Sequence, residues 1–178
     1  KFLKKKYFLS IGRLTKQKNF DFLINSYSKI FTNTNEYKLI IIGEGEDRKK
    51  LQNMINNLNL QNYVYLIGYK DNIFKYFRNA ECFILSSLWE DPGWVLIEAI
   101  ASNTIVLSSN CPSGPKEIIG EKNGILFKNN SEEDFIDKYK LYKKLNLIEK
   151  EKILINSKKS VKKFTMFYHF KTLKKILN

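Results

Sequence analysis

Short runs of consecutive apolar residues alternate along the chain with longer segments in which apolar residues recur every three or four positions. The short runs have the length and the apolar character of strands that are buried on both faces of a parallel sheet. They lie at 7–11, 38–42, 64–68, 82–85, 105–108 and 125–127. Helical spacing follows at 20–30, 47–58, 73–79 and 94–101, and again from 135 to 178. Because strands that alternate with helices favour right-handed crossovers, we predict an α/β fold with a Rossmann-like, doubly wound parallel sheet of about six strands.

The size of the chain predicts a single domain. With 178 residues, of which 43% are apolar, it has the length of one ordinary domain and enough apolar side chains for a core. It contains no internal repeat and no low-complexity linker, so residues 1–178 are expected to fold as one unit. It has no run of 18 apolar residues, and its first six residues, K-F-L-K-K-K, lack the apolar core of a signal peptide.

The net charge is strongly positive, at +13, with a calculated isoelectric point near 9.6. Such a charge raises nucleic acid or an anionic membrane as partners. However, all but three of the 31 basic residues are lysine, and asparagine, isoleucine, phenylalanine and tyrosine are abundant too. This joint bias is typical of an A+T-rich genome. A generally lysine-rich surface is therefore favoured over a basic patch that faces a membrane or an anionic acceptor.

Few residues can support metal or nucleophile chemistry. Cys82 lies in a predicted strand and Cys111 precedes a proline, so their spacing predicts neither a metal site nor a disulfide framework. The only histidine, His169, lies near the C-terminus, which leaves Ser-His-Asp and Cys-His chemistry with little to draw on. A reduced, cytoplasmic protein without a metal is expected.

The last segment, from 135 to 178, is rich in lysine and in aromatic residues. Ser131 and the three acidic residues after it are typical of the start of a helix, since a serine side chain caps free amides and acids match the helix dipole. Further on, a markedly aromatic apolar set is interpreted as packing residues. It comprises Phe164, Phe167, Tyr168, Phe170, Leu173, Ile176 and Leu177.

Two glutamates mark the candidate site. Glu90 falls in the loop after the strand at 82–85, and Glu98 lies on the helix that follows, with seven residues between them. Loops at the carboxyl ends of parallel strands surround the ligand crevice, and the next helix points its free amides at it. Two carboxylates in such a place suggest a polyhydroxylated ligand. A surface pair of structural glutamates is the alternative.

Cations follow the first strand. Arg13, Lys16 and Lys18 lie between the strand end and the helix start, where a diphosphate would be attracted by both charge and helix dipole. The alternative is a solvated lysine cluster. Gly43 and Gly45 follow the second strand, but a dinucleotide fingerprint would need a third glycine at the position of Arg48. These two glycines are therefore interpreted as giving the backbone room.

Three segments carry a resemblance to a known family. They are G-R-L-T-K-Q-K-N at 12–19, E-D-P-G-W-V-L-I-E-A at 90–99 and G-P-K-E-I-I at 114–119. Together they resemble the retaining glycosyltransferases of the GT-B fold, family 4, also called glycosyl transferases group 1. The family usually has E-G-F-G where this chain has E-D-P-G. Since proline donates no backbone hydrogen bond, a contact through the amide of Pro92 is excluded.

The resemblance implies a role for each motif residue. Arg13 and Lys18 would grip the donor diphosphate and stabilise its charge as it leaves, together with backbone amides at the helix start. Glu90 would hold sugar hydroxyls or stabilise positive charge at the anomeric carbon, and Glu98 would accept hydrogen bonds from the ribose. The loop 69–71 would lie against the base. The implied donor-binding residues are Gly12, Arg13, Lys18, Gly43, Gly45, Tyr69, Glu90, Gly93, Trp94, Val95 and Glu98, and those implied in catalysis are Glu90, Arg13 and Lys18.

The resemblance further implies that the chain is the C-terminal, donor-binding half of a GT-B enzyme. Such an enzyme transfers a sugar, here expected from a UDP-hexose or UDP-N-acetylhexosamine, with retention and without a metal or other cofactor. The acceptor would be a glycan or lipid-linked glycan, as in bacterial polysaccharide or lipopolysaccharide biosynthesis, and an N-terminal domain absent from this chain would bind it. Part of the aromatic C-terminal face would contact that domain. A cytoplasmic location is implied, with peripheral association at the inner face of the membrane left open.

Three alternatives rank below a transferase. A sugar-nucleotide epimerase shares the GT-B fold but would be expected to need further acid/base residues, which are scarce here. A non-catalytic nucleotide-sugar-binding module is suggested by Pro92. Nucleic-acid binding is suggested by charge alone, and would require aromatic platforms near basic loops.

Overall fold

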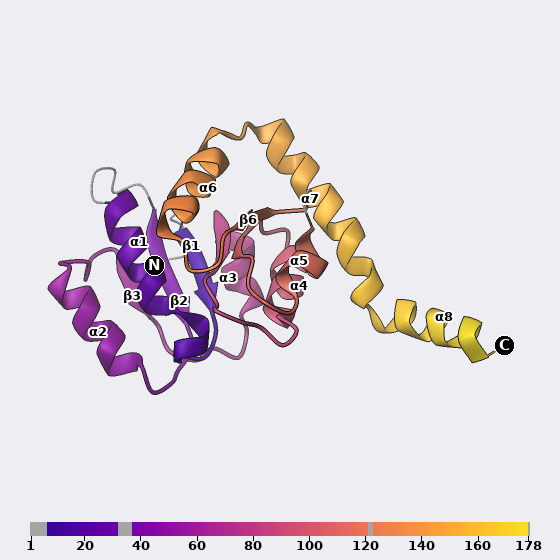
Figure 1. Ribbon diagram of the computed structural model, residues 1–178, viewed down its shortest axis with the longest axis horizontal. Helices are drawn as coiled ribbons and strands as arrows, with labels where there is room; N and C mark the ends of the chain where they lie inside the picture. The colour runs from indigo at the N-terminus through magenta and orange to yellow at the C-terminus, as the bar shows by residue number, and fades with distance from the viewer. Residues whose placement is uncertain (1–6, 32–36, 121–122, 178) are drawn as a thin grey trace.

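The computed structural model describes residues 7–31, 37–120 and 123–177. Six strands of this part form one parallel sheet in the order β3-β2-β1-β4-β5-β6, with helices on both faces (Figure 1). The predicted doubly wound α/β fold is therefore confirmed. The strands are β1 (Tyr7–Ile11), β2 (Lys38–Ile42), β3 (Val64–Leu66), β4 (Cys82–Leu85), β5 (Val106–Ser109) and β6 (Ile125–Phe127).

The helices that follow the strands divide between the two faces of the sheet. They are α1 (Phe20–Phe31), α2 (Arg48–Asn57), α3 (Phe74–Asn79), α4 (Trp94–Ala101), α5 (Pro115–Ile119), α6 (Glu132–Lys144), α7 (Leu147–Val161) and α8 (Met166–Leu177). Successive side chains of a strand point to opposite faces, so β1 sends Phe8 into one core and Leu9 into another. The first core packs against α1, α2 and α6, and the second against α3, α4 and α5.

Several element bounds differ from the predictions. Strand β3 ends at Leu66, two residues early, because Gly68 adopts a φ of 75° that no extended strand continues through. The strand predicted at 105–108 lies at Val106–Ser109. Helix α5 was not predicted, since five residues are too few for a helical period.

The helical segment predicted from 135 to 178 is interrupted twice. Helix α6 begins after Ser131, whose hydroxyl accepts a hydrogen bond from the Asp134 amide as expected of a capping serine. Helix α7 starts anew with a capping box formed by Asn146 and Glu149. The short 3₁₀ helix η3 (Lys162–Phe164) then separates α7 from α8.

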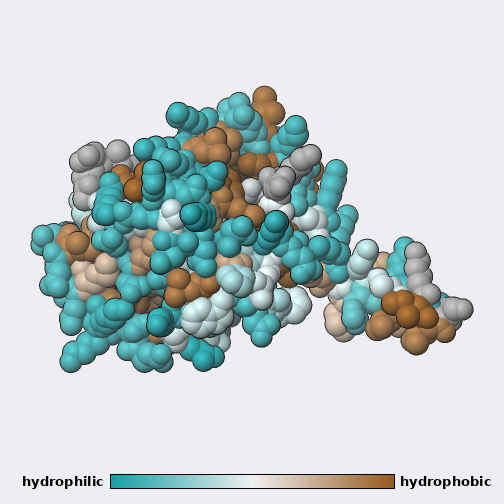
Figure 2. All heavy atoms as spheres, in the orientation of Figure 1, coloured by the Kyte–Doolittle hydropathy of each residue, from teal (hydrophilic) through white to brown (hydrophobic). Residues whose placement is uncertain are grey.

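Helix α8 projects away from the body of the molecule (Figure 1). Figure 2 shows hydrophobic surface on this projecting segment. Of the aromatic set interpreted as packing residues, Phe164 packs against the second core, whereas the members on α8 pack against neither core of the described residues. The exposed apolar side chains of α8 are Met166, Phe167, Tyr168, Phe170, Leu173, Ile176 and Leu177.

Candidate functional site

The carboxyl ends of β1 and β4 meet at the point where the strand order reverses. Parallel α/β sheets bind ligands in the crevice outside this point, because the loops after the two central strands diverge there. Strands β1 and β4 are direct neighbours, with Phe8 opposite Cys82. The loops that carry the predicted cations and Glu90 therefore start side by side.

The loop after β1 is bound to the loop after β2. The Gly12 amide donates to the Ile42 carbonyl at 3.0 Å, and the Leu14 amide donates to the Glu44 carbonyl at 2.8 Å. A Cβ on Gly43 would lie 1.9 Å from the Gly12 oxygen, and φ at Gly43 is 145°. The expected need for backbone room at Gly43 is confirmed.

Gly45 lies in the same crowded contact. A Cβ there would lie 2.3 Å from the carbonyl oxygen of Leu14, closer than real Cβ contacts come. No larger residue fits without moving backbone, so the second glycine also serves the close approach of the two loops.

An open cleft of about 420 Å³ lies between the ends of β1, β2 and β3. It brings together four of the predicted donor-binding residues, which come from three separate loops. Arg13 is exposed, and its guanidinium has no hydrogen-bond or ion-pair partner among the described residues. The cleft is lined by Ile11, Gly12, Arg13, Ile42, Gly43, Glu44, Tyr69, Lys70, Asp71 and Ile73.

Lys18 and Glu90 form a buried ion pair. The Lys18 Nζ lies 2.6 Å from Oε1 and 2.8 Å from Oε2 of Glu90. The side chains are only 15% and 4% exposed, respectively. The lysine stem passes beside Gly12, where a Cβ would lie 3.1 Å from both Cγ and Cδ of Lys18. Gly12 therefore leaves the space through which Lys18 reaches Glu90.

The loop that carries Glu90 packs on the segment before α5. The Glu90 amide donates to the Pro112 carbonyl at 3.1 Å. A Cβ on Gly114 would lie 1.9 Å from the carbonyl oxygen of Pro92. The close-packed turn expected at Gly114 is confirmed, and its partner is the motif loop itself.

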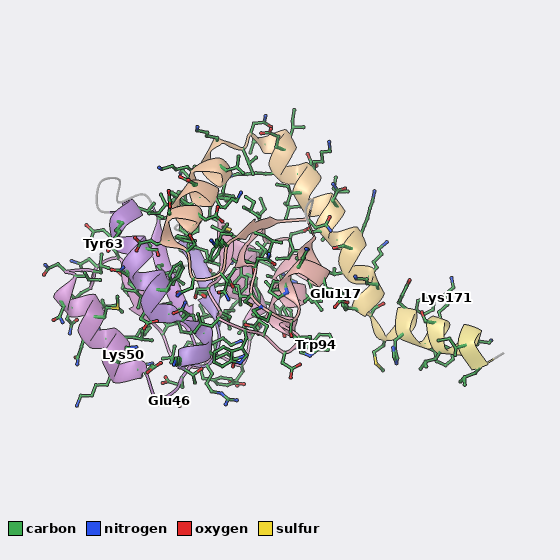
Figure 3. The ribbon with its side chains drawn as sticks, in the orientation of Figure 1. Glu46, Lys50, Tyr63, Trp94, Glu117 and Lys171 are labelled. Atoms are coloured by element: carbon green, nitrogen blue, oxygen red, sulfur yellow. The ribbon has the colours of Figure 1, made fainter. Side chains whose placement is uncertain are left out.

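Helix α4 begins directly at the motif. Gly93 precedes it with a φ of 87°, a left-handed conformation that favours glycine. The first amides of a helix lack intrahelical partners, so those of Trp94 and Val95 are free to bind an anion at this edge. In Figure 3, Trp94 lies at the lower edge of the molecule, as does Glu46 from the loop before α2.

Glu98 lies in the second turn of α4 and is half-buried. Burial raises the pKa of its carboxyl above the usual range. Within the described residues the carboxylate has no hydrogen-bond or ion-pair partner. It lies outside the lining of the cleft that holds Arg13. The predicted residues thus lie in three places: around the cleft that holds Arg13, in the buried Lys18–Glu90 pair, and in the first turns of α4.

The comparison with known proteins places this arrangement in a family. The sequence profile described as glycosyl transferases group 1 matches residues 1–161. The chain belongs to this family. The three motifs through which the resemblance was predicted all fall inside the matched region.

Relatives of this chain are named glycosyltransferases. An uncharacterized glycosyltransferase of Methanocaldococcus jannaschii is 48% identical over 112 residues, which cover 63% of this chain and 28% of that protein. The N-acetylgalactosamine-N,N'-diacetylbacillosaminyl-diphospho-undecaprenol 4-alpha-N-acetylgalactosaminyltransferase of Campylobacter jejuni is 39% identical over 119 residues, covering 67% of this chain and 32% of that one. The matched part of the chain therefore covers about a third of the length of these relatives.

A solved structure resembles the group 1 chain over nearly its whole length. It is a TarM variant of S. aureus in complex with Fondaparinux, alpha-GlcNAc-glycerol and UDP. The TM-score is 0.86 at 26% identity, and the match covers 98% of this chain and 36% of TarM. The GT-B type of glycosyltransferase domain that the resemblance implied is thereby confirmed.

Two serines of this family member support the buried pair and were not predicted. The Ser87 hydroxyl donates to Glu90 Oε1, and the Ser109 hydroxyl donates to the Ser87 carbonyl at 2.7 Å. A third contact joins the loops, since the Ser86 hydroxyl donates to the Lys18 carbonyl at 2.8 Å. The only sequence signal for such a role is the position of these serines at strand ends: Ser86 and Ser87 directly follow β4, and Ser109 is the last residue of β5.

Other residues near the motifs of the group 1 domain have structural surroundings. Glu117, which the family motif includes, is exposed on α5 and has its Oε1 4.0 Å from Lys163 Nζ. Cys111 is buried, which raises the pKa of its thiol. Among the described residues, no group of three histidine, cysteine or acidic side chains could hold a metal ion. No helix in the same ranges is long and apolar enough to cross a membrane.

Proposed function

We propose that the chain is the donor-binding domain of a retaining hexosyltransferase. It would transfer a sugar from a UDP-hexose or UDP-N-acetylhexosamine to a glycan or lipid-linked acceptor. The observation that carries the proposal is the buried Lys18–Glu90 pair at the switch point of the sheet, next to the cleft that holds Arg13. A charged pair enclosed at this point, beside an unpartnered arginine, suits an anionic and polyhydroxylated ligand.

The nucleoside would occupy the open cleft. Its base would lie against Tyr69 and its neighbours, in the part lined by Ile11, Ile42 and Ile73. The ribose would reach Glu98, whose carboxylate offers two acceptor oxygens and has no partner among the described residues. Hydrogen bonds from the ribose hydroxyls would favour the ionised form of the Glu98 carboxyl, which burial alone disfavours.

The diphosphate would be held by cations and amides without a metal. A lysine ammonium has three donors, and two of those of Lys18 point at the two oxygens of Glu90, which leaves one for a phosphate oxygen. Arg13 and the first amides of α4 would supply the rest. Since a diphosphate leaves as a stable anion, spreading its charge is the main catalytic requirement.

Glu90 would act on the transferred sugar. Its Oε1 already accepts from Lys18 and Ser87, and Oε2 accepts from Lys18, so one acceptor position stays open for a sugar hydroxyl. In the reaction, the bond from the anomeric carbon to the phosphate oxygen breaks and the acceptor oxygen bonds to that carbon on the same face. The acceptor proton passes to the departing diphosphate. The Glu90 charge would stabilise the positive charge that develops at the anomeric carbon.

The names of relatives support the choice of donor and acceptor. TarM was crystallised with UDP, and the Campylobacter jejuni relative is named for transfer to a diphospho-undecaprenol-linked sugar. Because the matched residues cover only 28% and 32% of these relatives, we propose that a further domain binds the acceptor. The protein would act in the cytoplasm, at the inner face of the membrane when the acceptor is lipid-linked.

A thermal-shift panel tests the proposal. UDP, GDP, ADP, their sugar derivatives, NADH and a short oligonucleotide would be added to the wild-type chain and to Glu98→Ala. At ten times its dissociation constant a ligand adds about 1.4 kcal/mol, or a rise of roughly 3 to 6 °C at this size. A rise with uridine nucleotides that Glu98→Ala removes supports the proposal. A response to the oligonucleotide alone contradicts it.

A further inference from the structure

Both tryptophans of the chain lie next to the Glu90 motif, and both are about half exposed. Trp89 precedes Glu90 and Trp94 begins α4, with exposed fractions of 46% and 56%. Tryptophan is large and mostly apolar, so an exposed indole leaves a broad apolar surface in water. Two such surfaces this close to the candidate site indicate a binding function.

The loop that carries Trp89 is held by its backbone. The Gln17 side chain donates to the Trp89 carbonyl at 3.0 Å, and the Leu88 amide donates to the Gln17 carbonyl at 2.8 Å. Asn129 donates to the Leu88 carbonyl at 2.9 Å. These bonds fix the backbone that presents the Trp89 indole, and the Trp94 indole is presented by the first turn of α4. A ligand that binds the two indoles therefore orders little backbone.

Trp94 forms one wall of a second pocket, of about 460 Å³. This volume lies in the range of small-molecule sites. The opposite wall is the junction between α7 and α8, and Figure 3 shows Trp94 on the side of the molecule that faces this junction. The lining in the described chain includes two basic residues and no acid. It consists of Trp94, Lys163, Phe164, Thr165, Met166 and His169.

Lys163 is held at this pocket with its charge only weakly paired. Its Nζ lies 4.8 Å from the centre of the Phe164 ring and donates to the Glu117 carbonyl at 3.3 Å. The nearest carboxylate oxygen, on Glu117, is 4.0 Å away, at the outer limit of an ion pair. Donors of the ammonium therefore stay available to an anion in the pocket.

We infer that this pocket is an acceptor subsite for a sugar that carries an anionic group, with the sugar ring on Trp94 and the anion at Lys163 and His169. The inference rests on the proposed function. The first backbone amides of α4 would face the diphosphate of the sugar donor, whereas the Trp94 side chain points toward the α7–α8 junction. An apolar indole face fits the C–H face of a pyranose, and a cation beside it fits a phosphate or carboxylate.

Intrinsic fluorescence tests the subsite directly, because Trp89→Phe leaves Trp94 as the only tryptophan of this chain. With UDP present, this variant would be titrated with N-acetylglucosamine 1-phosphate, glucuronic acid, methyl N-acetylglucosaminide and inorganic phosphate. We expect a saturable change in emission with the sugar phosphate, and at least tenfold weaker binding of the uncharged glycoside and of phosphate alone. Glucuronic acid shows whether a carboxylate replaces the phosphate.

A matched pair of lysine variants checks the cation. Lys163→Gln in the Trp89→Phe background should weaken binding of the sugar phosphate about tenfold. Lys159→Gln, on the exposed surface of α7 and outside the pocket lining, should leave it unchanged. If both variants lose affinity for the sugar phosphate equally, the effect is one of net charge and the subsite is overturned.

The remaining outcomes separate this inference from the proposed function. If the uncharged glycoside binds as tightly as the sugar phosphate, the requirement for an anion is overturned. If fluorescence changes only in Trp94→Phe, where Trp89 is the remaining tryptophan, the placement of the sugar at Trp94 is overturned. No response to any sugar, with stabilisation by UDP intact, overturns the subsite alone. Loss of stabilisation by UDP in the wild-type chain overturns the donor site and the proposed function.

Discussion

The Nζ of Lys18 lies within 2.8 Å of both carboxylate oxygens of Glu90, in a pair that is almost closed to water. The two residues were predicted as separate contacts of the ligand, one with phosphate and one with sugar. Their pairing means that neither charge waits unpaired for the donor. A sugar donor would therefore bind to the hydrogen-bonding positions of Lys18 and Glu90 that their mutual contact does not use. Because the two side chains are already held in place, this binding would need little reorganisation.

Lys18→Ala should lower stability as well as activity. It leaves the Glu90 charge buried without a partner, which costs about 3 to 5 kcal/mol, or roughly 6 to 20 °C in Tm. Lys16→Ala, at an exposed position in the same loop, is the control and should change Tm little. Thermal denaturation of both variants measures the difference. Equal Tm values would show that the Glu90 charge is compensated without Lys18.

The double variant Lys18→Met with Glu90→Gln separates the two effects. It removes both charges, so much of the stability lost in Lys18→Ala should return, since burying neutral groups of similar size costs far less than burying one charge. Stabilisation by UDP should stay absent, because the phosphate contact is gone. If the double variant is as unstable as Lys18→Ala, burial of the charge is not the cause.

Gly114→Ala should disrupt the motif loop. A Cβ there meets the Pro92 oxygen at 1.9 Å, and φ is 112°. Backbone strain and overpacking together cost about 2 to 5 kcal/mol. Gly120→Ala is the matched control, because φ is also positive, at 60°, but the nearest atom of Asn123 is 3.8 Å away. Denaturation should show the larger loss at Gly114, and only that variant should lose its response to UDP.

The sequence predicted the sheet better than the contacts at its edge. Apolar runs identify buried strands directly, so β1, β2, β4 and β6 were predicted with their observed bounds. Ser87 and Ser109 were missed because a serine at or just after a strand end carries no periodic signal, and because the partner of Ser109 comes from a different loop.

Helix α8 shows the opposite limit. Its spacing of apolar residues predicted an apolar face, but periodicity does not say what covers that face. The close packing at Gly43 and Gly114 was predicted because a family motif keeps glycine where the shared fold brings two backbones together. The Lys18–Glu90 pair was not predicted, because a motif assigns roles toward a ligand and not contacts between its own members.

Removal of α8 should leave the domain folded. The helix packs chiefly against η3, and most of its apolar side chains are exposed. A chain that ends at Thr165 should therefore keep its Tm within about 2 °C, since little apolar area leaves the core. It should also associate less in solution, because an exposed apolar patch is removed. Size-exclusion chromatography and thermal denaturation check both, and a large fall in Tm would show that α8 packs on the domain.

Glu98 should make the stability of the chain depend on pH. Burial raises the pKa of its carboxyl in the folded state, so the folded protein binds this proton more tightly than the unfolded chain does. Its contribution to stability is therefore fully present below the ordinary glutamate pKa of 4.5 and is lost as the pH rises through the higher folded pKa. At neutral pH, where the charged carboxylate is half-buried without a partner among the described residues, Glu98→Gln should be more stable than wild type.

Tm measured from pH 4 to pH 8 for both proteins checks this dependence. The difference between Glu98→Gln and wild type should be small in acid and grow toward neutral pH, in favour of the variant. UDP should then reverse the order at neutral pH, because a ribose diol donates to the carboxylate of wild type and finds a weaker acceptor in glutamine. A wild-type advantage at pH 7 without ligand would mean that Glu98 stabilises the empty fold, and that its carboxylate is not kept for a ligand.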